Sequence, residues 1–180
     1  ISFGIGSRAN GPNALAFGRG DIFWPGPQVV YNKADGTNSV AIGYCNNAES
    51  DYSVAIGFAN NITGNNSFGL GRQNTISAQY AFALGNLLNV SSYNSFVIGR
   101  YNVGGGNSSS WVSSDPIFEI GIGSSGNNEN AMTVLKNGNV GIGIVSPITS
   151  LDVRNLNVNT ASSTPGMLHV MSTDNQAIDI

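Results

Sequence analysis

Apolar and small or polar residues alternate within a short phrase that returns every 14 residues. The phrase is Asn38-Ser39-Val40-Ala41-Ile42-Gly43, and its later copies end at Gly57, Gly71, Gly85 and Gly99. Two looser copies precede it, ending at Gly18 and Gly6. Alternation with a period of two is typical of β-strands. Fourteen residues are too few for a helical hairpin repeat, but they suit one coil of a β-solenoid with two short strands and two tight turns. The sequence therefore predicts an all-β fold built from 14-residue coils.

The alternation divides each phrase into a large apolar face and a face of small residues. Burial of the large side chains would form a continuous apolar rod inside the roll. The second half of each coil adds one more inward position, at Ala48, Ile62, Ile76 and Val90. The predicted roll core from the phrase itself is Val40, Ile42, Val54, Ile56, Phe68, Leu70, Phe82, Leu84, Phe96 and Ile98.

The small residues of the phrase are predicted to face other copies of the chain. A solvated strand face normally carries longer polar side chains, whereas a row of Ser, Ala and Gly lets another surface approach closely. A thin roll of this length also buries little surface by itself, which favours a homo-oligomer. The predicted oligomer-facing residues are Ser39, Ala41, Ser53, Ala55, Ser67, Gly69 and Ala83.

An asparagine column runs through the repeat at Asn46, Asn60, Asn74 and Asn102, interrupted by Leu88. Two interpretations are open. The amides could form hydrogen bonds along the column, as side-chain ladders do in cross-β structures. Alternatively, Asn occupies these positions because it tolerates the left-handed backbone of a turn. Both interpretations give the column a structural role.

The phrase at this period resembles the head of YadA-like trimeric autotransporter adhesins. The resemblance covers residues 1 to about 103, and it implies a left-handed parallel β-roll, three of which pack around one axis as a homotrimer. One feature departs from the family, which usually has Ala where this chain has Asn46, Asn60 and Asn74.

The 14-residue period ends after the last phrase. Residues 104–115 are expected to form a linker or a cap, with Trp111 as a candidate seal for the end of the apolar rod. Residues 116–180 are expected to form a short-stranded β segment. The expected strands are 117–122, a hairpin of 132–136 and 139–142 joined by an Asn-Gly turn, 151–153 and 167–171.

The stretch 135–143, followed by Ser146-Pro147 and Leu151-Asp152-Val153, resembles a segment of phage tail fibres and large bacterial surface fibres. This resemblance implies a phage fibre or a bacterial adhesive filament. In such fibres the segment often precedes a cleavable chaperone, and none lies within these residues. Because the chain starts and stops within patterned sequence, we expect it to be a fragment of a longer protein.

The composition narrows the function classes further. Only 9% of the residues are charged, the net charge is −3, and the seven Lys and Arg form no basic patch, which argues against nucleic-acid binding. Cys45 alone permits neither an internal disulfide nor a multi-cysteine metal site. No apolar run approaches about 18 residues, so no membrane insertion is expected in this fragment.

No catalytic, cofactor or metal site is predicted. His169 has no metal-ligand neighbours, and the G-x-G-x-x-G match at 121–126 has no βαβ context. The alternative function is a polysaccharide-degrading tail spike, which would need a positioned carboxylate pair. Glu49 and Asp51 are the nearest acids, but they share one turn of one coil and are interpreted as solvated turn residues. An ice-binding solenoid ranks last, because no coil position is repeatedly Thr.

An insertion separates the phrases that end at Gly18 and Gly43, and Pro25 and Pro27 within it favour a loop that leaves the solenoid. Its aromatic residues either cover the roll or contact a receptor. Candidate receptor contacts are Arg19, Gly20, Asp21, Phe23, Trp24 and Tyr31.

The predicted function is that of an extracellular, structural and adhesive trimeric fibre domain. It would lie on a virion fibre or a bacterial cell surface and bind an unknown cell-surface receptor or glycan.

Overall fold

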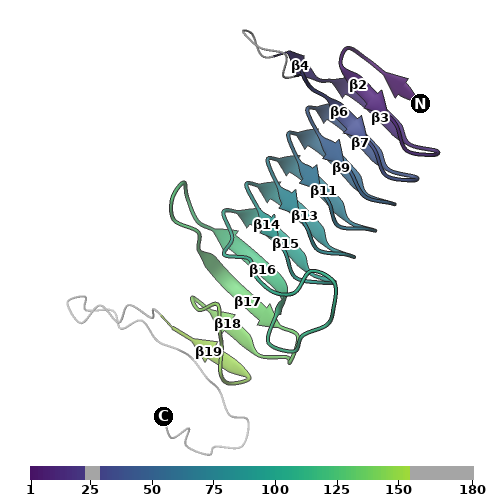
Figure 1. The fold of residues 1–180 in the computed structure, drawn as a ribbon. Coiled ribbons are helices and arrows are strands. Elements are labelled where there is room, and N and C mark those ends of the chain that lie inside the picture. The colour runs from purple at the N-terminus through teal and green to yellow at the C-terminus, as the bar shows by residue number, and fades with distance from the viewer. Residues whose placement is uncertain (23–28, 155–180) are drawn as a thin grey trace, which may run out of the picture.

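The computed structural model describes residues 1–22 and 29–154, and within these ranges the chain contains strands and turns but no helix. The strands stack one above another along an elongated molecule, with the N-terminus at one end and β19 near the other (Figure 1). Two sheets form the two walls of a roll, and within the repeat the strands of both are parallel. The all-β solenoid predicted from the repeat is confirmed.

The longer wall is an 11-stranded sheet. In spatial order its strands are β1 (Ser2–Phe3), β3 (Leu15–Arg19), β7 (Val40–Tyr44), β9 (Val54–Phe58), β11 (Phe68–Arg72), β13 (Phe82–Asn86), β15 (Phe96–Arg100), β16 (Pro116–Ile122), β17 (Asn130–Leu135), β18 (Val140–Ile142) and β19 (Leu151–Val153).

The shorter wall is a six-stranded sheet that ends where the repeat ends. Its strands are β2 (Ser7–Ala9), β6 (Asn32–Ala34), β8 (Asn47–Ala48), β10 (Asn61–Ile62), β12 (Thr75–Ile76) and β14 (Asn89–Val90).

Strand pairing follows the 14-residue period of the sequence. Phe68 pairs with Phe82, and Gly71 pairs with Gly85, so equivalent residues of successive coils lie side by side. The repeated glycine at the end of each phrase has a backbone reason. Gly57 has φ +119°, and a Cβ added there would lie 2.1 Å from the carbonyl oxygen of Gly71 in the next coil. A residue with a side chain would therefore separate the coils.

The interior of the roll is narrow and is filled by small side chains from the long sheet. Ala41, Ala55 and Ala83 are fully buried, and they face a second inward row from the short sheet, at Ala48, Ile62, Ile76 and Val90. The predicted inward position of this second row is confirmed. A Cβ added at Gly69 would lie 2.8 Å from Ile62 Cδ1 and 3.0 Å from Ile76 Cδ1. The glycine thus makes room for the two isoleucines opposite it.

From Asn32 to Asn74 the asparagine column forms a hydrogen-bonded ladder inside the roll. Asn46 Nδ2 donates to Asn32 Oδ1 at 3.1 Å, Asn60 Nδ2 to Asn46 Oδ1 at 3.0 Å, and Asn74 Nδ2 to Asn60 Oδ1 at 2.9 Å. The positive φ of each turn falls on the residue before the asparagine, for example 52° at Ala59. The ladder interpretation is therefore confirmed, and the left-handed-turn interpretation is wrong.

The insertion leaves the roll as an antiparallel pair formed by β4 (Asp21–Ile22) and β5 (Val29–Val30). The coils on either side keep their register across it, because Leu15 of β3 pairs with Val40 of β7. Residues 23–28 lie outside the described part of the chain, as do residues 155–180. The predicted strand at 167–171 therefore lies outside the described residues.

Beyond the repeat, the long sheet continues without a break. Phe96 of β15 pairs in parallel with Phe118 of β16, and Val97 pairs with Glu119. The expected hairpin is present, because β17 pairs antiparallel with β18 and Gly138 in the turn has φ +92°. Strand β19 lies at the predicted position and pairs in parallel with β18.

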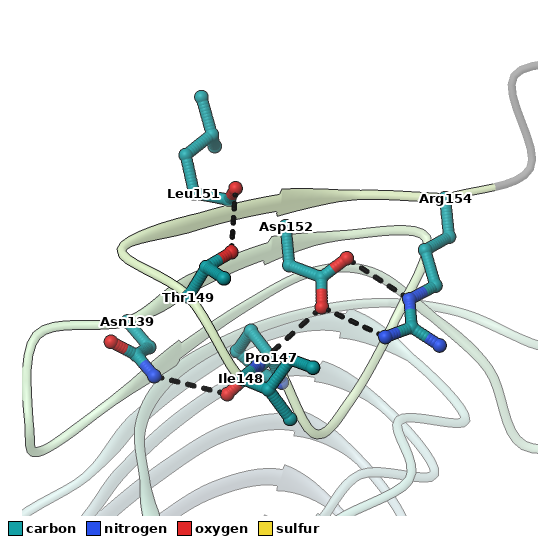
Figure 2. A network of polar contacts seen from close by, with 7 residues as sticks. All are labelled: Asn139, Pro147, Ile148, Thr149, Leu151, Asp152 and Arg154. Atoms are coloured by element: carbon teal, nitrogen blue, oxygen red, sulfur yellow. Dashed lines mark hydrogen bonds and ion pairs between the residues drawn. The ribbon is translucent and has the colours of Figure 1, made fainter. Parts of the chain in front are cut away.

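A polar network stabilises the turn that leads from β18 into β19 (Figure 2). Asn139 Nδ2 donates to the Pro147 carbonyl at 3.1 Å, and the Ile148 N–H donates to Asp152 Oδ2 at 3.4 Å. Arg154 binds the same carboxylate in a bidentate manner, at 3.0 and 3.1 Å. These bonds to Arg154 lower the pKa of the Asp152 carboxyl. The carboxylate thus connects the turn to the end of β19.

Trp111 does not seal the end of the roll as expected, because 52% of its surface is exposed. The indole instead lies beside Lys136, whose Nζ is 5.3 Å from the ring. The end of the interior is occupied by Glu119, which is only 3% exposed. This residue takes the inward position that Val97 holds one strand earlier.

The Glu119 carboxylate is held by donors alone. Oε2 accepts from Asn102 Nδ2 at 2.7 Å, and Oε1 accepts from Asn130 Nδ2 at 2.5 Å and from the Gly104 N–H at 3.2 Å. Neither amide can flip without losing a second hydrogen bond, made by its oxygen. Asn102 Oδ1 accepts from the Asn89 N–H, and Asn130 Oδ1 accepts from the Val103 N–H.

We therefore expect Glu119→Gln to lower the free energy of unfolding by about 1.5–3 kcal/mol per chain, because it replaces a charged acceptor with an amide that meets other donors. Denaturant titration measures the effect. The control is Glu129→Gln, which makes the same change at an exposed residue. Equal stability of the two variants would contradict the role given to Glu119.

Candidate functional site

An apolar face covers the outer side of the long sheet. It is formed by the large residues of the phrase, which are half-buried or exposed; Leu84 is 44% exposed and Phe96 is 40% exposed. We call this surface the outer apolar face. Its residues within the repeat are Val40, Ile42, Val54, Ile56, Phe68, Leu70, Phe82, Leu84, Phe96 and Ile98.

The sequence-based assignment of the two strand faces is therefore wrong. The residues assigned to the oligomer contact lie inside the roll. Their exposed fractions are 0% to 1%, and Gly69 is buried as well. They are Ser39, Ala41, Ser53, Ala55, Ser67, Gly69 and Ala83. The residues assigned to the roll core form the outer apolar face instead. The reason is the narrow interior, in which even a Cβ at Gly69 would contact Ile62.

Aromatic rings on this outer side stack from coil to coil. The centroids of Phe68 and Phe82 are 4.8 Å apart with an interplanar angle of 7°. Tyr44 and Phe58 stack in the same way at 5.1 Å. Further along the sheet the contact becomes edge-on, with an interplanar angle of 64° between Phe82 and Phe96, so equivalent rings stay in contact without keeping one orientation.

The outer apolar face continues past the repeat. Residues paired across neighbouring strands share one face of the sheet. Ile98 pairs with Ile120, Ile120 with Met132, and Met132 with Ile142. The last pair, Ile142 with Val153, carries the face to β19. A monomeric soluble protein rarely exposes an apolar surface of this extent.

The candidate receptor contacts in the insertion are only partly described. Arg19 is exposed at the end of β3, whereas Gly20 is buried and donates its N–H to the Ile5 carbonyl at 2.9 Å. The Asp21 carboxylate accepts a hydrogen bond from the Tyr44 hydroxyl, and this bond raises the pKa of Tyr44 to about 12. In the Arg-Gly-Asp triplet, Gly20 is thus part of the roll, and Asp21, at the start of β4, is connected to it through Tyr44.

The aromatic candidates of the insertion have different outcomes. Phe23 and Trp24 lie outside the described residues. Tyr31 lies next to the roll, with the guanidinium carbon of Arg8 5.0 Å from its ring centroid. Sequence reasoning did not select Arg8. Within the candidate set, Tyr31 contacts a charged side chain of strand β2, that of Arg8.

The acidic residues considered for catalysis each have a local partner. Glu49 Oε2 accepts from Asn47 Nδ2 at 3.2 Å, and Asp51 Oδ1 accepts from the Thr37 N–H at 2.7 Å. Burial raises the pKa of the Cys45 thiol, which disfavours a reactive thiolate. Residues 1–22 and 29–154 contain no group of three or more potential metal ligands. His169 lies outside the described residues.

The fold and its outer apolar face define a repeat protein whose coils leave one long surface uncovered. Residues 1–20 and 34–59 match the YadA head domain repeat in two copies. The chain therefore contains YadA-like head repeats, as the phrase Asn38–Gly43 indicates. Proteins with this head are trimeric, surface-exposed structural adhesins. No curated protein matches the chain, and no solved structure does.

In the part of the chain that the structure describes, no helix is long and apolar enough to cross a membrane.

Proposed function

We propose that this chain is a segment of a homotrimeric, extracellular fibre that attaches a virion or a bacterial cell to a host or surface. The observation that carries the proposal is the outer apolar face, which runs along the long sheet from the repeat into β19. Three copies of the chain would bury this face around a common axis. The match to a head repeat of trimeric adhesins supports the same assembly.

The continuity of the sheet supports one structural unit along the fibre. Strand β16 keeps the register of β15. The outer apolar face therefore stays on the same side of the sheet from the repeat to the hairpin. The resemblance of residues 135–153 to fibre segments fits this arrangement. The proposed role is therefore structural and adhesive, without catalysis, and it applies equally to a phage fibre and a bacterial filament.

Sedimentation equilibrium tests the assembly. The expected mass is three times the 18.7 kDa of one chain. Attachment is tested by coating beads with the trimer and measuring their retention on candidate host cells. A monomeric mass contradicts the assembly, and a trimer that retains no beads on any surface contradicts the adhesive role.

A further inference from the structure

A shallow pocket opens on the outer side of the short sheet, next to the base of the insertion. Strands β2, β6 and β8 form its floor. This side of the roll is opposite to the outer apolar face, so the pocket stays open when chains pack through that face. The lining residues are Arg8, Asn10, Tyr31, Lys33, Asp35, Cys45 and Asn47.

Arg8 supplies an uncompensated positive charge at this pocket. Its guanidinium carbon lies 5.0 Å from the centroid of the Tyr31 ring, and the side chain is exposed. Among residues 1–22 and 29–154, no hydrogen bond or ion pair to the Arg8 guanidinium is present. A guanidinium held over a ring keeps the N–H groups at its rim available, and their fork geometry fits a carboxylate.

The other two charges of the pocket neutralise each other. Lys33 Nζ lies 3.1 Å from Asp35 Oδ2, and Asn10 Nδ2 donates to Asp35 Oδ1 at 2.6 Å. The lining residues therefore carry one net positive charge, that of Arg8, while the acidic Glu49 lies outside the lining and accepts from Asn47 Nδ2. This local charge favours an anionic ligand.

Asn47 forms part of the floor of the pocket, and its amide is held in place by hydrogen bonds. Its Nδ2 donates to Asn61 Oδ1 at 2.7 Å and to Glu49 Oε2 at 3.2 Å, which fixes the orientation of the amide. Its Oδ1 is buried and has no partner among the described residues. Because this oxygen is fully buried, Asn47 shapes the floor of the pocket rather than binding a ligand hydroxyl.

We propose that this pocket binds an acidic sugar residue of a surface polysaccharide, with the carboxylate on Arg8 and the sugar hydroxyls on the acceptor oxygens of Asp35. A peptide carboxylate would use Arg8 but would bring no hydroxyl to the acceptors. The inference rests on the proposed adhesive function and gives it a ligand class. Three pockets per trimer would strengthen a weak single contact through multivalency.

The test uses the assembled protein and isothermal titration with tetragalacturonate as the acidic probe. Maltotetraose is the neutral sugar of equal length, and tetraglutamate is the acidic peptide. We expect tetragalacturonate to bind more tightly than either. Arg8→Gln should weaken this binding about tenfold or more, because it removes the charge and the guanidinium fork. Arg100→Gln makes the same change at an exposed residue away from the pocket and should leave the affinity unchanged.

Four results would overturn the inference: no binding of tetragalacturonate, equal binding of maltotetraose, tighter binding of tetraglutamate, or equal losses in the two arginine variants. Sedimentation of the same samples separates this failure from failure of the proposed function. A trimer whose coated beads attach to cells but that ignores tetragalacturonate overturns the pocket alone. A monomer contradicts the proposed assembly itself.

Discussion

Leu84→Glu should convert the trimer into a folded monomer. Leu84 lies on the outer apolar face and is 44% exposed in the single chain, so a charge there costs the isolated roll little. In the trimer the same change would bury unpaired carboxylates at the interface, which is strongly unfavourable. Sedimentation equilibrium should give the mass of one chain, while circular dichroism retains the β-sheet signal.

The neighbouring residue provides the matched comparison. Ala83 is fully buried inside the roll. Ala83→Leu should overpack the interior and lower the free energy of unfolding by about 1–3 kcal/mol or more, without a specific effect on association of the chains that remain folded. If Ala83→Leu gives a stable monomer and Leu84→Glu a stable trimer, the two faces have been assigned the wrong way round.

Asn60→Ala should be the most damaging single change in the asparagine ladder. Asn60 Nδ2 donates to Asn46 Oδ1 and to the carbonyls of Ile56 and Gly71, each at 3.0 Å. Its Oδ1 accepts from both the backbone N–H and Nδ2 of Asn74. Removing the amide leaves several buried groups unsatisfied at about 1–3 kcal/mol each. We expect a loss of about 3 kcal/mol per chain in denaturant titration.

Asn61→Ala is the control for this change. Asn61 follows Asn60 directly, but its side chain lies on the outer side of the short sheet, where it accepts one bond from Asn47 at 2.7 Å. Its loss should cost about 0.5–1.5 kcal/mol at most. A similar stability for the two variants would show that the ladder adds nothing beyond an ordinary surface contact.

The sequence was sufficient to predict the 14-residue coil, but not which strand face lies inside the roll. The spacing of Gly43, Gly57 and Gly71 predicts the pairing that the structure shows, and the Asn137-Gly138 pair predicts the hairpin turn. Alternation defines two strand faces without saying which one is enclosed. The enclosed face is decided by the distance between the two walls of the roll. The structure shows that this distance is short, because Gly69 packs directly against Ile62 and Ile76.

One signal in the sequence pointed to the correct faces. Ile62 and Ile76 are large and lie opposite the smallest residue of the phrase, Gly69, as expected if both lie in one confined interior. The usual rule that large apolar residues lie inside treats each chain as a monomer. In a chain that exposes a long apolar sheet, those residues become buried only when chains associate.

The sequence analysis missed the pocket because the insertion obscures how the short strands on either side of it pair. Arg8 pairs with Lys33, and Lys33 pairs with Asn47. Aligning Arg8-Ala9 with Lys33-Ala34 and Asn47-Ala48 across the insertion would have placed both cations on the outer side of neighbouring short strands. The third element, the contact of Arg8 with Tyr31, depends on how the insertion returns to the roll.

The most direct test of the central claim measures distances between spin labels in the assembled protein. One variant carries Leu84→Cys on the outer apolar face, and the other carries Thr75→Cys on the exposed outer side of the short sheet. Both have Cys45→Ser, which removes the native thiol. If the chains pack through the outer apolar face, the distance between labels of different chains is shorter at position 84 than at position 75. Equal distances, or a shorter distance at position 75, would contradict the account.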